Sequence, residues 1–397
     1  MVAAFGDPGH AFPAIALAKE LHLRGNDVCV ETWSKWQEHV EREGMHFAAA
    51  PVYTVFGDGK APLKPYQAAV KASAVTGALI EEFDPEAVVA DILTVAAALA
   101  AEVHGRAWAT LVPHVLPTPS SGFPPYSIGA RLPRTRVGRE MWRRFDPLLR
   151  GGLEQGREQL NDSRARVGLP PLDHVHGGIS RELALVATFP QLEYPRPERQ
   201  PWVKVTGPLM WEQPFGPVEL PPGDDPLVLV APSTAQDPEH RMLRAALAGL
   251  ADEPVRVIAT TNRREPPEPI AVPGNARLVD WLSYARTMPT CDAVILHAGH
   301  GTLVRALSCG VPVLACPAAG DMNENAARVS WAGAGVALPR RLITPRGVRL
   351  ALRRLLGDSG YARRAAELRD WASAHDGGAA AAAEVEALAE GAGASAH

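Results

Sequence analysis

The sequence predicts an α/β protein made of two Rossmann-like, doubly wound domains that face each other across a cleft. Apolar strand patterns alternate with amphipathic helix patterns from the first residues onward. A proline-rich stretch without periodicity spans residues 207–226, and a second alternating series follows it. The length of 397 residues allows two domains, each with a core of its own.

The first series predicts a parallel sheet with helices on both faces. Its strands are predicted at residues 2–5, 28–32, 47–50, 87–90 and 108–112. Helices are predicted at 11–23, through Trp36 and Val40, and at 94–104. Two longer interruptions, 52–65 and 113–136, are rich in Pro, Gly, Ser and aromatic residues. They follow the carboxyl ends of strands, where loops line the crevice of such folds.

The second series predicts another parallel sheet. Its strands are predicted at residues 227–231, 256–260, 293–296 and 311–316. The chain after Asp376 is rich in Ala, Gly and Glu, which predicts one helix and then a flexible end. The predicted organisation is therefore a domain at 1–206, a linker at 207–226, a domain at 227–375, and a C-terminal helix with a flexible tail at 376–397.

Composition narrows the classes of function. The chain is 46% hydrophobic and 21% charged, and its net charge of −4 gives no reason to expect nucleic acid as a partner. No apolar run reaches the ~18 residues that span a bilayer, and the first residues lack a basic signal region, so we expect a cytoplasmic protein without stable membrane insertion.

Four cysteines in or beside apolar segments, with no C-x-x-C pair, predict reduced core thiols. No Asp-x-Asp pair occurs, so the commonest sequence sign of a metal-held diphosphate is absent.

A glycine turn follows the predicted strand that ends at Leu296. Its residues are His297, Ala298, Gly299, His300, Gly301 and Thr302, and a helical pattern follows. The start of a helix offers unpaired N–H groups and the positive end of a dipole, and glycines let an anion approach the backbone. The turn is suited to a diphosphate, although many such turns only connect a strand to a helix.

His10 and Asp91 are the candidate catalytic residues. His10 lies between the first strand and its helix, and Asp91 ends the strand at 87–90, so both belong to the crevice end of the sheet. A carboxylate on one imidazole nitrogen raises the basicity of the other, which gives a base able to deprotonate a hydroxyl. The alternative for Asp91 is that it caps the helix that starts near Thr94.

Further candidates follow strands of the second domain. Ser233 and Thr234 follow the strand at 227–231 and would face the glycine turn, unless they are an ordinary cap. Trp281 could stack on a nucleobase or belong to the core. Asp321 could accept from sugar hydroxyls or cap the helix that it opens.

These segments together resemble glycosyltransferases of the GT-B fold that use UDP- or dTDP-sugars. The resemblance is carried by Trp281, by HAGHGT, by Cys309-Gly-Val-Pro-Val-Leu-Ala-Cys-Pro, by Asp321-Met-Asn-Glu-Asn and by Gly333-Ala-Gly. The N-terminal GDPGHAFPAIALAKELHLRGNDV, the segment ALVATFP and the segment VTGP are also similar to that family, so the resemblance spans nearly the whole chain. It is strongest to bacterial enzymes that decorate secondary metabolites, such as calicheamicin-type and macrolide-type transferases.

The resemblance implies a role for each matching residue. His10 matches the general base and Asp91 its partner, in the acceptor-binding N-terminal domain. The residues that match the donor site are His297 and the turn from Gly299 to Thr302, with Ser233 and Thr234, for the diphosphate; Trp281 and Leu282 for the base; and Asp321, Met322 and Asn325 for the sugar. Base and leaving diphosphate on opposite walls imply inversion, with no metal or other cofactor.

Three departures from the family pattern bear on the donor. Met322 stands where a glutamine often holds sugar hydroxyls, which favours a deoxy or otherwise modified sugar. Arg305 stands where relatives carry a ribose-binding glutamate, which favours dTDP over UDP. His300 stands where a small residue or tryptophan is common, and the sequence offers no reason for it.

The acceptor is expected to be a small apolar or polycyclic alcohol or phenol. Its candidate contacts are aromatic or polar residues of the two long loops and the next helix, each of which could instead be packing: Tyr53, Phe56, His114, Phe123 and Trp142. Two other functions stay open, a lipid or cell-wall transferase docked through the basic segment 131–150 and a non-catalytic partner of an active transferase. A homodimer is compatible with the sequence, which does not fix the oligomeric state.

Overall fold

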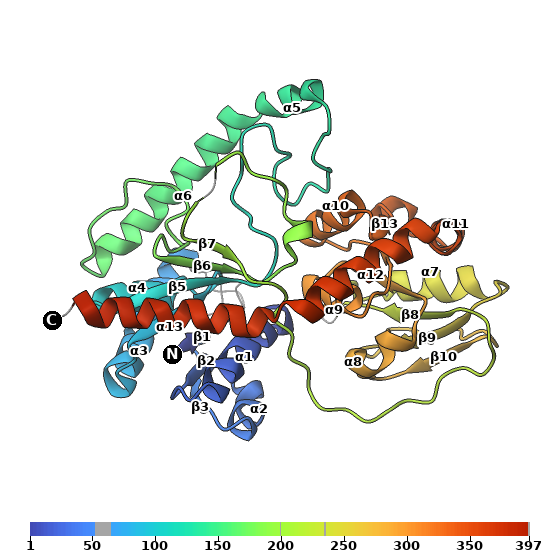
Figure 1. Ribbon diagram of the computed structural model, residues 1–397, viewed down its shortest axis with the longest axis horizontal. Helices are drawn as coiled ribbons and strands as arrows, with labels where there is room; N and C mark the ends of the chain where they lie inside the picture. Colours follow the sequence, from blue (N-terminus) through green and yellow to red (C-terminus); the bar gives the residue numbers. More distant parts are fainter. Residues whose placement is uncertain (52–64, 199, 234–235, 396–397) are drawn as a thin grey trace.

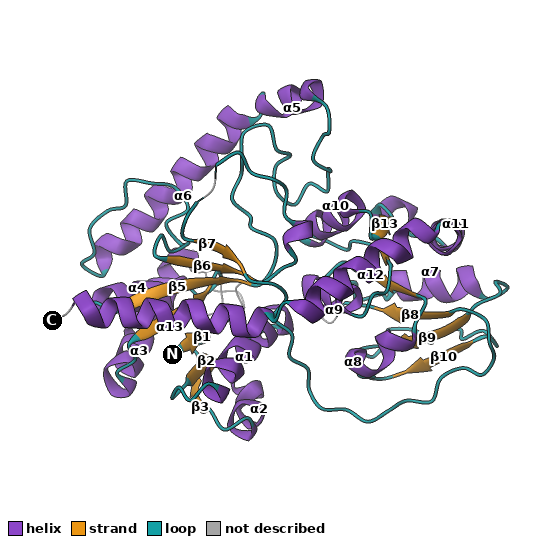
Figure 2. Ribbon diagram, viewed as in Figure 1, coloured by secondary structure: helices purple, strands orange, loops and turns teal. Residues whose placement is uncertain are grey.

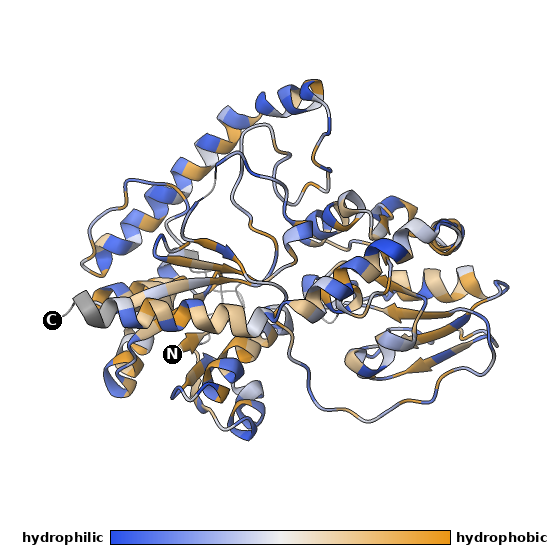
Figure 3. Cartoon of the chain, viewed as in Figure 1, coloured by the Kyte–Doolittle hydropathy of each residue, from blue (hydrophilic) through white to orange (hydrophobic). Residues whose placement is uncertain are grey.

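The computed structural model describes residues 1–51, 65–198, 200–233 and 236–395. It contains two parallel sheets, each covered by helices on both faces (Figures 1 and 2). The central strands of both sheets are strongly apolar and buried (Figure 3). The predicted two-domain α/β architecture is confirmed.

The N-terminal sheet has seven strands in the order β3-β2-β1-β4-β5-β6-β7. Their bounds are β1 Val2–Ala3, β2 Cys29–Thr32, β3 His46–Ala49, β4 Ala87–Asp91, β5 Ala107–Val112, β6 Leu183–Val186 and β7 Val203–Val205. All neighbouring pairs are parallel. The strand order reverses between β1 and β4, and in doubly wound sheets the loops after such strands open the ligand crevice.

The helices of this domain are α1 Pro8–Leu23, α2 Gln37–Arg42, α3 Pro65–Phe83, α4 Val95–Val103, α5 Arg136–Arg143 and α6 Asp146–Arg166, with short 3-10 turns η1 Ser34–Trp36 and η2 Pro190–Leu192. Apolar residues of α1 cover one face of the sheet, whereas α3 and α4 cover the other. The sequence prediction missed α3, whose mixture of Ala, Ser and Thr gives a weak helical pattern.

The C-terminal sheet has six parallel strands in the order β10-β9-β8-β11-β12-β13. The strands are β8 Leu227–Ala231, β9 Arg256–Thr260, β10 Ala276–Val279, β11 Ala293–Leu296, β12 Val313–Ala315 and β13 Gly335–Ala337. The helices are α7 Arg241–Leu250, α8 Tyr284–Thr287, α9 His300–Ser308, α10 Met322–Ala332, α11 Pro345–Gly357 and α12 Ser359–Ala374, with η3 Met288–Thr290 and η4 Arg340–Leu342. The order reverses between β8 and β11.

The chain crosses between the domains twice, at neighbouring positions. The linker leaves the N-terminal domain at Gly207, and the return crossing lies at Gly377 (Figure 1). A Cβ atom added to Gly377 would lie 2.7 Å from the carbonyl oxygen of Pro208, so the two segments cross in close contact.

The C-terminal helix α13, Gly377–Ser395, belongs to the N-terminal core. Its residues Ala381, Ala382 and Val385 are buried in one cluster with residues of α1 and β4. The predicted C-terminal helix is confirmed over Gly377–Ser395, and the predicted flexible end after it lies outside the described residues. The four cysteines are free thiols, as predicted, and Cys29, Cys291 and Cys316 are buried.

Candidate active site

His10 and Asp91 meet where the strand order of the N-terminal sheet reverses. His10 lies in the first turn of α1, and Asp91 is the last residue of β4. His10 Nδ1 lies 2.8 Å from Asp91 Oδ1, and Asp91 Oδ2 accepts from the N–H of Phe5 at 3.2 Å. With its Nδ1–H donated to the carboxylate, the neutral imidazole carries its lone pair on Nε2. The structure therefore brings the predicted base and its predicted partner into contact.

The Asp91 carboxylate does not cap helix α4. Thr94 is the N-cap of that helix, and no side chain caps it. The Thr94 N–H donates to the main-chain carbonyl of Asp91, while the Asp91 side chain is fully buried against His10. The capping alternative is wrong, because the carboxylate is committed to the imidazole and to Phe5.

Carboxylates on both sides of the cleft act on His10. Burial lowers the pKa of His10, but the hydrogen bond and charge of Asp91, with further contributions from Asp321 and Asp7, outweigh burial and leave the pKa raised. Asp321 belongs to the C-terminal domain. Charges of both domains therefore act on the His10 imidazole.

His114 is the one predicted acceptor residue that the described part of the chain places beside His10. The two rings lie 6.5 Å apart and nearly perpendicular. His114 Nδ1 lies 2.8 Å from the Val115 carbonyl oxygen and 3.3 Å from the Tyr126 hydroxyl. Burial lowers the pKa of His114. A neutral His114 with its proton on Nδ1 can accept a hydrogen bond at Nε2.

The other predicted acceptor contacts differ in outcome. Phe123 is buried between Tyr194 and Leu132, a later residue of the same loop. Its prediction as an acceptor contact is wrong, because these residues cover its ring. Trp142 lies on α5, which buries no side chain, and its ring packs against Phe145. Tyr53 and Phe56 lie outside the described residues.

The glycine turn of the C-terminal domain forms as predicted, between β11 and α9. Ala298 adopts a left-handed backbone conformation, with φ of 61°, and Gly299 is the N-cap of α9. A Cβ atom added to Gly299 or to Gly301 would meet nothing within 4 Å. The protein therefore leaves open space beside the N–H groups of the first helical turn, as an anion site requires.

His297 shapes the loop opposite this turn. Its Nδ1 accepts from the N–H of Ser233 at 2.9 Å, and its Nε2 lies 3.2 Å from Asp237 Oδ2. Burial raises the pKa of Asp237, but hydrogen bonds from His297 and from the N–H groups of Met242 and Arg241 lower it to about 2. Both ring nitrogens are therefore occupied, and a direct contact of His297 with a diphosphate would require it to release Asp237. Thr234 lies outside the described residues.

His300 points into the boundary between the domains. Its Nε2 lies 3.3 Å from the carbonyl oxygen of Ala187, and its Nδ1 lies 3.3 Å from Asn325 Oδ1. The Asn325 amide donates to the Ala298 carbonyl at 2.9 Å. Both side chains are buried in these contacts, so the predicted role of either in donor binding would require it to release them.

The two residues predicted for the nucleobase differ in burial. Trp281 is half-buried, and the guanidinium of Arg263 lies 4.6 Å from the centre of its ring. Leu282 is buried in the core, which leaves its backbone for contact with a base. Arg263 already forms a cation–π contact with Trp281, and the predicted stacking on a nucleobase stays a prediction.

Asp321 stands at the N-cap position of α10 but makes no side-chain cap hydrogen bond. The capping alternative is therefore wrong for Asp321 as well, and its partly exposed carboxylate acts on His10 instead. Met322 is partly buried and packs against the C-terminal core, and its predicted contact with a donor sugar stays a prediction.

Arg305 anchors the linker. Its Nη2 donates to the Trp211 carbonyl oxygen at 3.1 Å, and its Nη1 lies 3.7 Å from Glu212 Oε2. Glu212 also accepts from the N–H groups of Tyr284 and Ala285, at 2.7 and 2.9 Å. The sequence prediction missed Glu212, whose carboxylate lies beside Arg305.

The described residues contain no group of three or more His, Cys, Asp or Glu side chains placed to hold a metal ion. Across those same residues, no helix is both long and apolar enough to cross a membrane.

Comparisons with known proteins agree with this architecture. Residues 244–388 match the family "Erythromycin biosynthesis protein CIII-like, C-terminal domain". The chain is 29% identical to 4'-demethylrebeccamycin synthase of Lentzea aerocolonigenes, covering 95% of this chain and 96% of that protein. Among solved structures, it is similar to the glycosyltransferase of kitacinnamycin, with a TM-score of 0.76 and 21% identity over 98% and 97% of the chains. It is also similar to the glycosyltransferase VinC in complex with dTDP, with a TM-score of 0.69 and 19% identity over 98% of each chain.

The protein is a glycosyltransferase with the GT-B fold. Its residues 244–388 are of the erythromycin CIII-like C-terminal type, and over nearly its whole length the chain is similar to 4'-demethylrebeccamycin synthase.

Proposed function

We propose that this protein is an inverting, metal-independent glycosyltransferase that transfers a sugar from a dTDP- or UDP-sugar to a hydroxyl group of a small-molecule natural product. The contact between His10 and Asp91, in a cleft whose other wall carries Asp321 and the start of α9, is the observation that carries this proposal. Related proteins bear names from antibiotic biosynthesis, and one was solved with dTDP, which supports a nucleotide-sugar donor.

The chemistry assigned to each group follows from its position. His10 Nε2 removes the proton of the acceptor hydroxyl as the acceptor oxygen bonds to the anomeric carbon of the sugar. The bond from that carbon to the phosphate oxygen breaks, and the electron pair leaves on the nucleoside diphosphate. The N–H groups of the first turn of α9, from His300 to Thr302, stabilise the leaving charge without a metal. Attack from the N-terminal wall on a donor held by the C-terminal wall inverts the anomeric carbon.

The base assignment is tested with His10→Ala. Transfer should fall by roughly 10²–10⁴-fold, while the thermal shift produced by dTDP or UDP stays that of the wild type, because the nucleotide contacts lie in the other domain. His22→Ala, in the same helix α1, is the matched control and should keep full activity. Wild-type turnover in His10→Ala would refute the assignment.

The partner role is tested with Asp91→Asn. An amide can donate to His10 Nδ1 and would then leave the proton on Nε2, which is the wrong tautomer for a base. We expect transfer to fall as far as in His10→Ala with little change in melting temperature. A donor that is bound but neither transferred nor hydrolysed by the wild type, with any acceptor in a panel of polycyclic phenols, would favour a non-catalytic partner protein instead.

A second candidate function is transfer at a membrane surface, and the α5–α6 arm is the observation that favours it. Val137, Met141 and Leu148 are 73%, 61% and 75% exposed, and Phe145 is 45% exposed. Their spacing of three or four residues places them along one side of the helical arm. Seven arginines against two acidic residues occur between positions 131 and 150, so this apolar stripe is bordered by positive charge and fits an anionic lipid surface.

Vesicle sedimentation tests this second candidate. Vesicles containing phosphatidylglycerol should pull down the wild type, and Leu148→Glu should weaken that binding, whereas phosphatidylcholine vesicles should not bind either protein. Equal recovery of wild type and variant with both vesicle types would reject membrane docking.

A further inference from the structure

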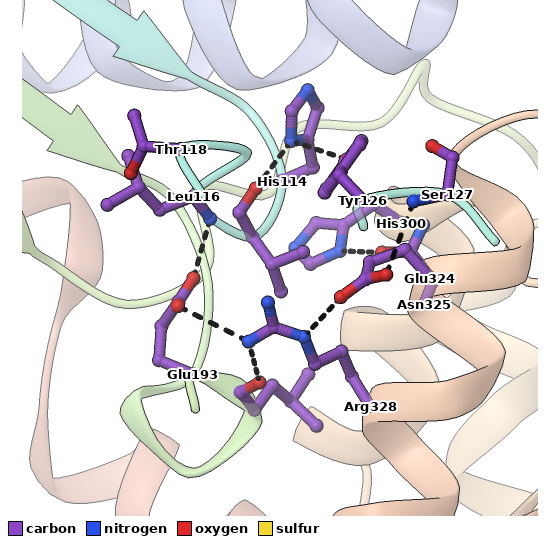
Figure 4. Close-up of polar contacts among 12 residues, drawn as sticks. His114, Leu116, Thr118, Tyr126, Ser127, Glu193, His300, Glu324, Asn325 and Arg328 are labelled. Carbon is purple, nitrogen blue, oxygen red and sulfur yellow. Dashed lines mark hydrogen bonds and ion pairs between the residues drawn. The ribbon is translucent and has the colours of Figure 1, made fainter. Parts of the chain in front are cut away.

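The loop between β5 and α5, residues 113–135, is held at two points by carboxylates, one partly buried and one buried. The N–H of Leu116 donates to Glu193 Oε1 at 2.6 Å, and the N–H of Ser127 donates to Glu324 Oε2 at 3.3 Å (Figure 4). Glu193 belongs to the N-terminal domain, whereas Glu324 lies in the first turn of α10 in the C-terminal domain. One loop is thus tied to both domains.

Arg328 joins the two carboxylates. Its Nε donates to Glu324 Oε1 at 2.7 Å, and its Nη1 lies 3.4 Å from Glu193 Oε2 and 3.1 Å from the Leu192 carbonyl oxygen (Figure 4). Its guanidinium carbon lies 3.6 Å from the centre of the Tyr194 ring. Arg328 is 2% exposed. A buried arginine that serves two carboxylates and an aromatic face is held in one geometry.

The residues around this cluster extend it. Arg196 donates to the carbonyl oxygens of Thr118 and Leu116 at 2.7 and 3.0 Å, which are further points of the same loop. Arg328 pairs with the two glutamates, and Arg196 adds a second positive charge that is bonded to carbonyl oxygens of the loop. The ring of Trp331, on α10, lies 5.0 Å from that of Tyr194 in the other domain. The contact between the domains at this cluster therefore has both a charged and an apolar part.

The two elements that this cluster joins carry the two substrates in the proposed function. The loop carries His114, whose ring lies 6.5 Å from that of His10. Helix α10 begins after Asp321, which faces His10 from the donor side. The position of the loop relative to α10 therefore sets the separation between an acceptor hydroxyl and the donor sugar.

We propose that Arg328 is a positioning residue that fixes the loop 113–135 relative to helix α10. Binding of acceptor at the loop and binding of donor at α10 then reinforce each other. This inference rests on the proposed function. A purely structural role predicts that losing Arg328 lowers stability alone. A positioning role also predicts that water replaces the acceptor more often, because His10, Asp91 and α9 remain intact while the loop loses its register.

The test compares Arg328→Lys with Arg164→Lys. Arg164 is an equally buried arginine, 2% exposed, but its carboxylate partner is Glu102 in the same domain, at 2.7 Å. Lysine keeps the charge and loses the bidentate geometry in both variants. The first readout is hydrogen exchange at the amides of Leu116 and Ser127, in protein with and without dTDP. We expect at least tenfold faster exchange at both amides in Arg328→Lys and no change at either in Arg164→Lys.

The second readout is the ratio of sugar transfer to donor hydrolysis. We expect this ratio to fall about tenfold in Arg328→Lys, with a rise in the acceptor KM and donor hydrolysis at the wild-type rate. Should the Arg328 variants fail to fold, Glu193→Gln removes only the charge pair across the domains and keeps an oxygen for the Leu116 amide. It should lower the ratio by severalfold.

Equal exchange and equal transfer-to-hydrolysis ratios in Arg328→Lys and Arg164→Lys would overturn the positioning role. Failure of the proposed function is recognised separately, since it would appear as a wild type that neither transfers nor hydrolyses either donor. The exchange readout needs no turnover and would still decide whether Arg328 holds the loop.

Discussion

Asp321 faces His10 from the opposite domain. Against the burial that lowers the pKa of the His10 imidazole, the Asp321 carboxylate acts together with Asp91 to raise it. Charges of both domains therefore contribute to the raised pKa of His10. A donor sugar that binds at Asp321 would meet the same electrostatic environment that tunes the base.

The pH dependence of transfer should report this coupling. Catalysis needs neutral His10, so kcat/KM should fall as the pH drops through its pKa, which lies above the usual value of about 6.5. Asp321→Asn removes one of the charges that raise the pKa, so its acidic limb should move to lower pH. The measurement is kcat/KM between pH 5.5 and 8.5, with Asp27→Asn at a site away from the cleft as the control. An acidic limb at the same pH in Asp321→Asn and the wild type would show that the charge does not reach His10.

Gly301→Ala should separate stability from nucleotide binding. The added Cβ meets no protein atom within 4 Å, and alanine is a better helix former than glycine, so the free energy of unfolding should stay level or rise by about 0.5 kcal/mol. If the diphosphate sits against the first turn of α9, the methyl group enters its space, and the affinity for dTDP should fall at least tenfold. Calorimetric titration with dTDP measures this. Gly357→Ala, where a Cβ also meets nothing, is the control. Unchanged affinity in Gly301→Ala would move the diphosphate away from this turn.

Glu31 is a buried carboxylate that the proposed reaction does not use. Its described side-chain partner is the Thr76 hydroxyl, at 2.9 Å, and burial raises its pKa to about 7, against a hydrogen bond from Thr76 that lowers it. Between pH 4.5 and 7 the folded protein keeps a proton that the unfolded chain releases, so stability falls as the pH rises through that window. Glu31→Gln removes the cost of the buried charge.

Chemical denaturation at pH 4.5 and pH 8 should reveal this cost. At pH 8, Glu31→Gln should be more stable than the wild type by up to ~3 kcal/mol, and at pH 4.5 the two should differ little. Glu38→Gln, on the exposed side of α2, is the control for removing a carboxylate. If the difference in stability between Glu31→Gln and the wild type is the same at both pH values, folding does not raise the pKa of Glu31.

The architecture could be predicted because buried parallel strands are continuous apolar runs. The predicted bounds of β8, β9 and β11 match the structure for this reason. Strands β10 and β13 were missed, since they are short and carry partly exposed residues at the edges of the sheet. The contact of His10 with Asp91 could be predicted as well, because it depends only on two strands whose carboxyl ends meet at the reversal of the sheet.

The remaining contacts of the site depend on packing that has no local signature. His297 and Asp237 are 60 positions apart, and Arg328 and Glu193 are 135 apart, so no spacing in the chain links them. Phe123 and His300 have residue types that suit a pocket or an interface equally well. Their burial is decided by how the long loop folds back and how the two domains meet.

His300 gives the boundary between the domains a dependence on acidity. Burial, with a smaller contribution from the charge of His114, lowers the pKa of His300 to about 3, against hydrogen bonds with Asn325 and Ala187 that raise it. Between pH 3 and about 6.5 the unfolded chain binds a proton that the folded protein excludes, so the free energy of unfolding falls as the pH falls through that window.

At pH 5 the loss from His300 amounts to ~2 kcal/mol relative to pH 7.5. His300→Gln cannot titrate, so it should be less stable than the wild type at pH 7.5, where only the ring's packing is lost, and should recover most or all of that difference at pH 5. Urea unfolding at the two pH values measures the change, with the pH 7.5 pair as the internal reference for packing. A stability difference of the same size at pH 5 and pH 7.5 would show that His300 takes up its proton in the folded protein, and that the contact with Ala187 survives in the charged form.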